Sequence, residues 1–314
     1  MKKIKNLAIL LCALFAFSSC QEWLTIQPET QVTKDEMFKT QAGFYDALMG
    51  CYTVMRDNYS PDGGMVVGAV ELMANLWNVT VDGGTSYELA THNYRESLVD
   101  GMLGTLFLQQ YEVIANLNLM LEYMETQDGV LSNDEYTMYK GEALALRAFI
   151  HFDLIRLWGP MPSQVNDAYE YLPYETTVQL EAYPYSTYRD YMDDLCADLD
   201  SAEVLLTQFE SVASVYKNRM NYYAVLGLQA RVHLWLGEND EALRYARLVK
   251  DAVDGEGLSV FQLGTQADLN QYDRVFYGSE QLFGLELEEF NDNMLADGDL
   301  AQFSQRTSYL TELY

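Results

Sequence analysis

The chain has 314 residues, of which 49% are apolar and 13% aromatic, and its 47 Asp and Glu against 19 Lys and Arg give a formal net charge of −28. This content can build the core of one large or two modest domains and argues against wholesale disorder. The acidic balance offers no basic surface that would release counterions from phosphate backbones, so we expect no nucleic-acid partner. Tyrosine is unusually frequent, with 24 Tyr against 13 Phe and 4 Trp.

The N-terminus has the pattern of an export signal. A lysine-rich start precedes an apolar run over residues 7–17, and Ser18 and Ser19 then precede Cys20. This run is too short for a permanent membrane span. The arrangement resembles a bacterial lipobox, so we predict a lipoprotein signal peptide over residues 1–19 and lipidation of Cys20. An ordinary signal peptide with an incidental cysteine is the alternative.

Removal of the signal changes the charge and defines the anchor. The loss of three lysines leaves 16 Lys and Arg against 47 acids, a formal net charge of −31. Acyl chains, and not charge, must therefore hold the mature protein to its membrane. Residues 20–34 contain Pro28 and little periodic pattern, and we expect them to be a tether.

Apolar periodicity predicts a mainly helical chain. The predicted helices cover residues 35–57, 98–126, 133–158, 187–207, 221–236 and 239–252. The Gly-rich stretch 58–96 is expected to be loops around one short helix, and the Tyr- and Pro-rich stretch 163–186 a long ordered loop. Residues 281–286 are a candidate short strand.

The helix over 133–158 has the clearest signals. Ser132 and Glu135 form a predicted capping box, and Gly159-Pro160 ends the helix. Its second half is apolar on most faces and should lie inside the protein. The polar residues in this half need partners if they are buried: Arg147, His151, Asp153 and Arg156.

The last two predicted helices resemble a tetratricopeptide unit. Small residues recur at Ala230, Gly237, Ala242 and Ala246, a spacing that suits the close crossing of two antiparallel helices.

Few residues are arranged for catalysis or metal binding. The three histidines are far apart, and nucleophile and nucleotide motifs are missing from the sequence, so we expect no cofactor, no metal and no enzyme activity. We interpret Cys51 and Cys196 as small packed residues rather than a disulfide. The acidic pairs Asp193-Asp194 and Glu288-Glu289 leave a helical glycosidase as an alternative.

The best candidate ligand site is aromatic. Trp77 lies in the Gly-rich stretch with Asn75, Asn78 and Asp82. An indole face can stack on sugar C–H groups while amide and carboxylate oxygens bind hydroxyls. We therefore predict that these four residues bind a ligand. The alternative is a half-buried tryptophan with a purely structural role.

Four segments together resemble the SusD/RagB family. They are Cys20-Gln21-Glu22-Trp23-Leu24 followed by Pro28, the helix and its exit over 142–162, the helix over 191–206, and the helical pair over 221–243. The resemblance implies a mainly α, tetratricopeptide-like scaffold of helical hairpins with long loops and little β structure. It also implies a SusD-like helical domain over residues 35–260, with 261–314 as the start of an incomplete ligand-binding C-terminal half.

The resemblance further implies a function. Members of the family are outer-membrane surface lipoproteins that bind glycans and form the lid of a SusC-like TonB-dependent transporter, and they are not enzymes. We therefore expect an oligosaccharide, such a transporter and the outer membrane as partners. The alternative is a tetratricopeptide-type interaction lipoprotein, or a peptide-binding lid, that binds no sugar.

Overall fold

The computed structural model describes residues 33–60, 64–79, 83–213, 215, 217–265, 280–285 and 303–305. The predicted signal peptide, Cys20 and nearly all of the predicted tether lie outside these residues, as does most of the stretch 261–314. Statements below refer to the described part of the chain.

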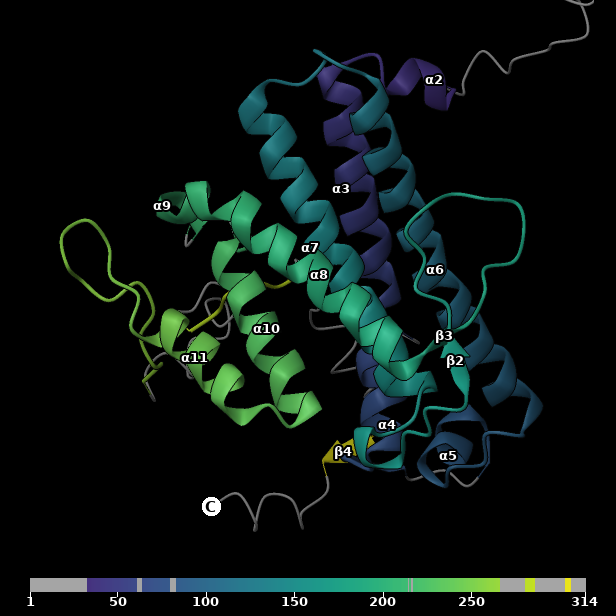
Figure 1. Cartoon of the computed structure of the whole chain (residues 1–314). Helices are drawn as coiled ribbons and strands as arrows, with labels where there is room; N and C mark the ends of the chain where they lie inside the picture. Colours follow the sequence, from purple (N-terminus) through teal and green to yellow (C-terminus); the bar gives the residue numbers. More distant parts are fainter. Residues whose placement is uncertain are drawn as a thin grey trace, which may run out of the picture.

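Long helices dominate the structure (Figure 1). The α-helices are α2 (Lys34–Met37), α3 (Gln41–Asn58), α4 (Glu71–Met73), α5 (Thr85–Ala90), α6 (Ser97–Thr126), α7 (Asn133–Trp158), α8 (Tyr188–Leu206), α9 (Glu210–Ala213), α10 (Tyr222–Leu236) and α11 (Asn239–Lys250). A π-helical turn, η2 (Met65–Val70), runs into α4, and short 3₁₀ turns are η3 (Pro162–Gln164) and η4 (Thr207–Phe209).

The described strands form two small antiparallel sheets. β1 (Trp77–Val79) pairs with β4 (Phe303–Gln305), with Trp77 opposite Gln305. β2 (Glu170–Leu172) pairs with β3 (Ser186–Thr187) and closes the long loop between α7 and α8. The prediction of a mainly α fold with little β structure is confirmed.

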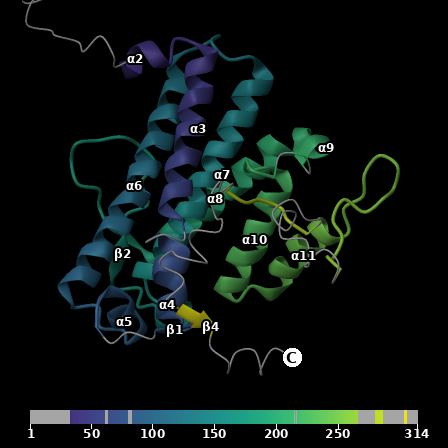
Figure 2. The ribbon, with the colours of Figure 1, turned by 180° about the vertical axis from the view of Figure 1, so that it is seen from behind.

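Helix α7 is the central helix of the molecule. Views from both sides show α3, α6 and α7 running side by side, with α8 crossing α7 (Figures 1 and 2). The predicted capping box is present, because Ser132 Oγ accepts from Glu135 N and the Glu135 carboxylate accepts from Ser132 N. Nearly every residue from Gly141 to Ile155 is buried. Gly141 allows close packing, since a Cβ there would lie 2.7 Å from Leu206 Cγ.

Helices α10 and α11 form the predicted helical hairpin. Gly237 ends α10 with a φ of 80°, which favours glycine, and the Glu238 N–H closes the turn on the His233 carbonyl oxygen at 2.8 Å. Ala242 is buried in the crossing, but Ala246 is exposed. The small-residue pattern was thus wrong for Ala246, because the buried face of α11 passes through Tyr245 instead.

Three other sequence predictions need correction. The stretch 58–96 holds η2, α4, β1 and α5 rather than one short helix, because Met65, Ala69 and Leu72 are buried at helical spacing between the flanking glycines. The predicted helix 35–57 is broken after α2, where Thr40 caps α3. Residues 281–285 form no strand.

The charged side chains of α7 find partners inside the protein. Arg147 makes a two-pronged ion pair with Asp198 of α8, with Nε–Oδ2 and Nη2–Oδ1 distances of 2.7 and 2.6 Å. Arg147 Nη1 donates to Asn118 Oδ1 of α6 at 2.8 Å, and the Tyr174 hydroxyl donates to Asp198 Oδ2 at 2.5 Å. Both charges are buried, so these bonds must replace lost water. The expectation that Arg147 has a partner is confirmed.

The same group of side chains fixes the loop segment 173–177. Asn118 Nδ2 donates to the Glu175 carbonyl oxygen at 2.9 Å, and the Glu175 N–H donates to His151 Nε2 at 3.3 Å. Because Nε2 accepts, Nδ1 carries the ring proton and lies 2.8 Å from the Tyr191 hydroxyl. Burial lowers the pKa of His151 to about 3, so this histidine is a neutral core residue. The expectation that a buried His151 has partners is confirmed.

The two described cysteines behave as predicted. Cys51 is buried, Cys196 is half-buried, and both are free thiols. Burial raises the pKa of each thiol, to about 12 and about 11 respectively, so both stay protonated and unreactive near neutral pH.

Arg147→Met should lower the free energy of unfolding by about 3–5 kcal/mol, because Asp198 would remain buried without its opposite charge. Urea unfolding followed by circular dichroism measures the change. The control is Arg189→Met, an exposed arginine on α8, the helix that carries Asp198, for which we expect a change within about 0.5 kcal/mol. Equal stability of the Arg147 variant and the parent would contradict the structural role of the pair.

Glu175→Gln should stabilise the protein at high pH. Burial raises the pKa of Glu175 to about 7, whereas a Glu in the unfolded chain titrates near about 4.3. The folded state therefore holds a proton that the unfolded state has lost, and its stability falls as the pH rises through about 7. Gln cannot ionise, so the melting temperature of the variant should exceed that of the parent at pH 8 and match it at pH 4. The exposed Glu170→Gln is the control; a pH-independent difference would contradict the assignment.

Candidate functional site

Trp77 is held in a fixed orientation on β1. Its indole is half-buried, and Nε1 donates to Glu71 Oε2 at 2.6 Å. The ring packs against a small cluster of buried side chains, Leu72, Leu89 and Val99, at the end of the molecule that carries α4, α5 and β4 (Figure 1). A ring that is already fixed loses little rotamer freedom when a ligand stacks on it.

Asn75 makes the turn that leads into Trp77. It ends α4 in the left-handed region, with a φ of 57°, which Asn tolerates better than most residues. The Asn75 N–H donates to the Leu72 carbonyl oxygen at 2.9 Å, and the Leu76 N–H donates to the Glu71 carbonyl oxygen at 3.0 Å, which is a Schellman motif. The half-buried amide of Asn75 makes no hydrogen bond within the described residues and is available to a ligand.

The other two predicted ligand residues are placed differently. Asn78 follows Trp77 along β1, and successive strand residues point to opposite faces, so its amide lies on the other side of the strand from the indole. Asp82 lies outside the described residues. The structure therefore brings Trp77 and Asn75 together on one turn and separates Asn78 from them.

Two further ring side chains, His92 and Tyr94, lie close to the turn at Asn75. His92 follows α5 with a φ of 60°, and its Nε2 donates to the carbonyl oxygen of Met73 at 2.7 Å. Tyr94 is 44% exposed, and its ring centroid lies 5.9 Å from that of His92. Met73 itself packs on the cluster beneath Trp77. No spacing pattern in the sequence points to His92 or Tyr94, because both are single ring side chains in a polar loop.

We call Trp77, Asn75, His92 and Tyr94 the Trp77 site. It combines aromatic rings with neutral hydrogen-bonding groups, which suits stacking and hydroxyl recognition of a sugar. The groups are presented by turns on a helical scaffold, where binding residues are usually found.

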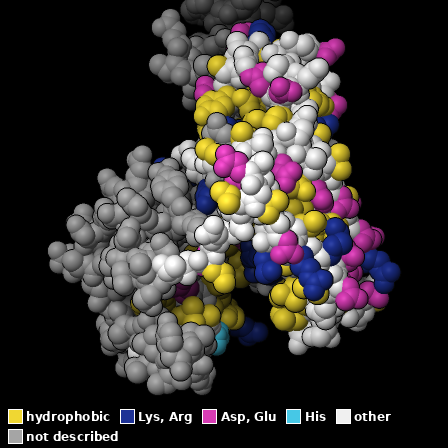
Figure 3. Space-filling view, turned by 90° about the vertical axis from the view of Figure 1, so that its left-hand side faces the viewer, with side chains coloured by type: hydrophobic (Ala, Val, Ile, Leu, Met, Phe, Trp, Pro, Cys, Tyr) yellow, Lys and Arg dark blue, Asp and Glu magenta, His cyan; other side chains and the backbone are white. Residues whose placement is uncertain are grey.

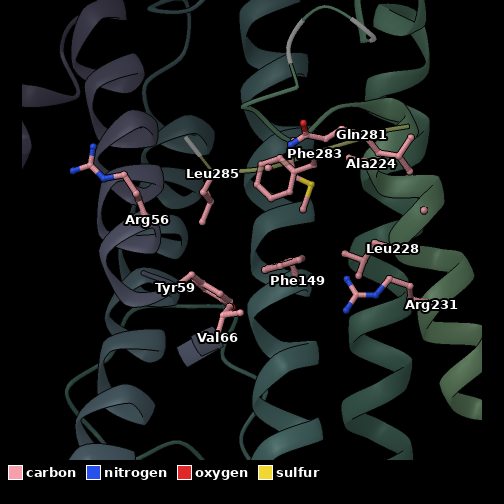
Figure 4. A pocket seen from close by; sticks show the side chains of 14 residues that line it. Arg56, Tyr59, Val66, Phe149, Ala224, Leu228, Arg231, Gln281, Phe283 and Leu285 are labelled. Atoms are coloured by element: carbon pink, nitrogen blue, oxygen red, sulfur yellow. The ribbon is translucent and has the colours of Figure 1, made fainter. Parts of the chain in front are cut away.

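A larger groove of about 680 Å³ lies among α3, α7 and α10 (Figure 4). Its walls are mostly apolar and include Tyr59, Phe149 and Leu228, while the segment 281–285 runs along one side. Arg56 lies on the α3 side and Arg231 on the α10 side (Figure 4). On the face drawn in Figure 3, Lys and Arg side chains lie at several places among acidic and apolar side chains. We call this cavity the α3–α7–α10 groove.

The predicted acidic pairs do not form a cleft in the described structure. Asp193 and Asp194 are exposed on α8, and Glu288 and Glu289 lie outside the described residues. Among the residues that the structure describes, no carboxylate lines the α3–α7–α10 groove. Within the described ranges, no three His, Cys, Asp or Glu side chains are grouped to hold a metal ion. None of the helices in those ranges is long and apolar enough to cross a membrane.

Comparison with known proteins gives the family. A family model for SusD-like proteins, described as "Starch-binding associating with outer membrane", matches residues 22–234, which is more than half of the chain. The chain belongs to the SusD-like family. The resemblance predicted from the sequence is confirmed, as is the mainly α scaffold.

Relatives of this SusD-like chain are longer than the chain itself. A SusD-like protein of Formosa agariphila is 28% identical over 267 residues, which cover 77% of this chain and 45% of that protein. The chain thus spans about half the length of the curated relatives it matches.

Solved structures support the same fold. A SusD superfamily protein of Bacteroides fragilis superposes with a TM-score of 0.63 at 19% identity, over 82% of this chain and 58% of the other. One of Bacteroides thetaiotaomicron gives a TM-score of 0.62 at 21% identity, over 79% and 53%. A laminarin-binding SusD-like protein gives 0.59 at 17% identity, over 78% and 50%.

Proposed function

We propose that this SusD-like chain is part of a cell-surface lipoprotein that binds an oligosaccharide and delivers it to a SusC-like TonB-dependent outer-membrane transporter. The family match over residues 22–234 carries the proposal, because that family is described as starch-binding and associated with the outer membrane. The neighbour named for laminarin binding shares the fold. The role is capture without bond cleavage, so the protein acts as a binding protein and not as an enzyme.

The Trp77 site is the proposed point of contact with the sugar. The indole offers a ring face, and its N–H is already satisfied by Glu71, so a ligand need not break that bond. The amide of Asn75 makes no hydrogen bond with the described residues and supplies a donor and an acceptor for hydroxyl groups. Asn78 and Asp82 remain proposed ligand residues on the same stretch of chain. Stacking with a few hydrogen bonds is the usual way in which a mostly apolar surface orients a ligand.

The proposed location rests on Cys20. A signal peptide over 1–19 and a tether over 20–34 would place the helical domain on lipid chains at the outer membrane, on the cell surface. The acidic charge of the chain supports a lipid anchor, since an anionic surface would repel the protein.

A second candidate function is supported by the α3–α7–α10 groove. Its aromatic and aliphatic lining, which includes Tyr59, Phe149 and Leu228, faces a space among α3, α7 and α10 that the segment 281–285 borders on one side. Such a groove is typical of proteins that bind an apolar peptide segment. A tetratricopeptide-type interaction lipoprotein, or a peptide-binding lid, would use this groove and not Trp77.

Trp77→Ala should weaken glycan binding at least tenfold, about 1.4 kcal/mol, because the stacking face is lost. Affinity electrophoresis against starch and laminarin, followed by calorimetry with the retained glycan, measures the effect. Trp77→Phe keeps a ring and should retain most of the affinity. The matched control is Trp158→Ala, since Trp158 is also half-buried but packs on Phe107 at 5.3 Å between ring centroids. If the folded parent protein is retarded by neither glycan nor by a wider polysaccharide panel, the glycan proposal fails and the peptide-binding alternative gains.

Cys20→Ala should release the protein from the outer membrane into the soluble fraction, because no acyl chains would then be attached. Detergent-free fractionation with an immunoblot is the measurement. Cys196→Ala, which changes a cysteine in the folded domain, should stay with the membrane. A Cys20→Ala protein that still sediments with outer membrane would disprove the lipoprotein assignment.

A further inference from the structure

A second pocket, of about 470 Å³, opens between the C-terminal end of α7 and α10. Two aromatic side chains, Phe152 and Trp235, and two arginines, Arg156 and Arg231, line it. Arg231 also lines the α3–α7–α10 groove and therefore lies on the wall between the two cavities. Two guanidinium groups thus face one concave surface in a chain whose formal net charge is −28.

The two guanidinium groups are held against the same ring. Arg156 Cζ lies 4.6 Å and Arg231 Cζ 5.8 Å from the centroid of Phe152. Cation–π attraction accounts for part of this arrangement. Asp153 accepts a hydrogen bond from Arg156 Nη2 and a second one from the Tyr59 hydroxyl at 2.7 Å. The Asp153 carboxylate therefore bonds to both Tyr59 and Arg156, and it makes no hydrogen bond to Arg231.

The described residues offset the positive charge of this pocket only in part. Asp153 pairs with Arg156 and also attracts Arg231, which is exposed and makes no hydrogen bond or ion pair with the described residues. Partial desolvation and then repulsion by Arg156 lower the pKa of Arg231. The Nε–H of Arg156 is buried without a hydrogen-bond partner among those residues, and an anion in the pocket would satisfy it.

We infer that this pocket binds the carboxylate of an acidic sugar, such as a uronic acid residue of an oligosaccharide, through Arg156 and Arg231. Guanidinium groups pair with carboxylates through two parallel hydrogen bonds. The indole Nε1 of Trp235 already donates to the Tyr188 hydroxyl at 2.8 Å, so the tryptophan offers its ring rather than its N–H to the sugar. The inference rests on the proposed glycan-binding function and adds the charge class of one glycan unit.

An acidic polypeptide would offer the same carboxylate, but the surroundings favour a sugar. Residues 281–285 of the protein's own chain already run along the α3–α7–α10 groove, on the other side of Arg231. The Arg156–Arg231 pocket offers ring faces and the hydroxyl of Ser163 within a mostly apolar wall. Rings and polar groups together are what a pyranose binds.

The overall acidity of the chain does not prevent such binding. Exposed charges further than about 8 Å from the ligand are largely screened at physiological ionic strength. The guanidinium groups would be in contact with the carboxylate, where attraction is screened least. Binding should therefore be strongest for a short oligosaccharide that places one uronate in the pocket, and weaker for a long polyanion.

Calorimetry at physiological salt tests the inference with four probes: trigalacturonate, trimannuronate, neutral galactotriose and triglutamate. The parent protein should bind at least one acidic trisaccharide ten or more times more tightly than galactotriose. Arg231→Gln should remove that preference without lowering the melting temperature, because it also removes the repulsion from Arg156. Arg231→Lys keeps the charge but lacks the planar guanidinium group, so it should lose part of the preference for the acidic trisaccharide. Arg189→Gln, an exposed arginine of α8, is the control and should change nothing.

The outcomes separate this inference from the proposed function. If both acidic trisaccharides bind no better than galactotriose while Trp77-dependent glycan binding persists, the inference is overturned and the proposed function stands. If triglutamate binds as tightly as the acidic sugars and depends equally on Arg231, the pocket serves a polypeptide carboxylate and the sugar assignment is overturned. If the acidic preference survives in Arg231→Gln, the ligand is bound elsewhere and the assignment is again overturned.

Discussion

The ion pair between Arg147 and Asp198 links most parts of the scaffold. It joins α7 to α8, and through Asn118 it also includes α6. Both charges are buried, so neither can move without leaving the other uncompensated. Tyr174 completes the group by bonding to the same carboxylate, and this fixes the loop between α7 and α8 at its midpoint. One buried charge pair thereby sets the positions of three helices and a long loop.

A comparison of Arg147 with Arg231 shows how the same side chain can indicate structure or function. Arg147 has a carboxylate and an amide oxygen in hydrogen-bond contact, so its burial is fully compensated within the protein. Arg231 lines two cavities and has a like charge, Arg156, as a neighbour, with no partner of its own in the described structure. Arg231 is exposed and takes no part in the buried polar contacts of the core. Unbalanced charge facing a cavity is a frequent mark of a binding site.

The features that the sequence predicted well are those with local causes. The start of α7 follows from the capping box at Ser132, and its burial follows from an apolar run longer than one helix face. The Trp77 site stays a prediction, and it also rests on a local pattern, a Gly-rich stretch with Asn residues. The partner of Arg147 lies 51 positions away in the chain, and no periodicity connects the two. The position of Tyr94 near Trp77 and the position of Arg156 and Arg231 on one ring, Phe152, likewise result from tertiary packing, so patterns in a single sequence could not predict them.

Three tyrosines complete the hydrogen bonding of buried ion pairs. Three carboxylates of the core accept a hydrogen bond from a phenol: Glu142 from Tyr52, Asp153 from Tyr59 and Asp198 from Tyr174. Each of these carboxylates also pairs with an arginine, namely Arg219, Arg156 and Arg147. Burial, together with the neighbouring carboxylate, raises the pKa of each of these tyrosines, so each stays a neutral donor throughout the physiological range. Because a phenol donates a hydrogen bond without adding charge, the tyrosine satisfies a carboxylate oxygen whose charge one arginine already balances, which suits a chain with 24 Tyr and only 19 Lys and Arg.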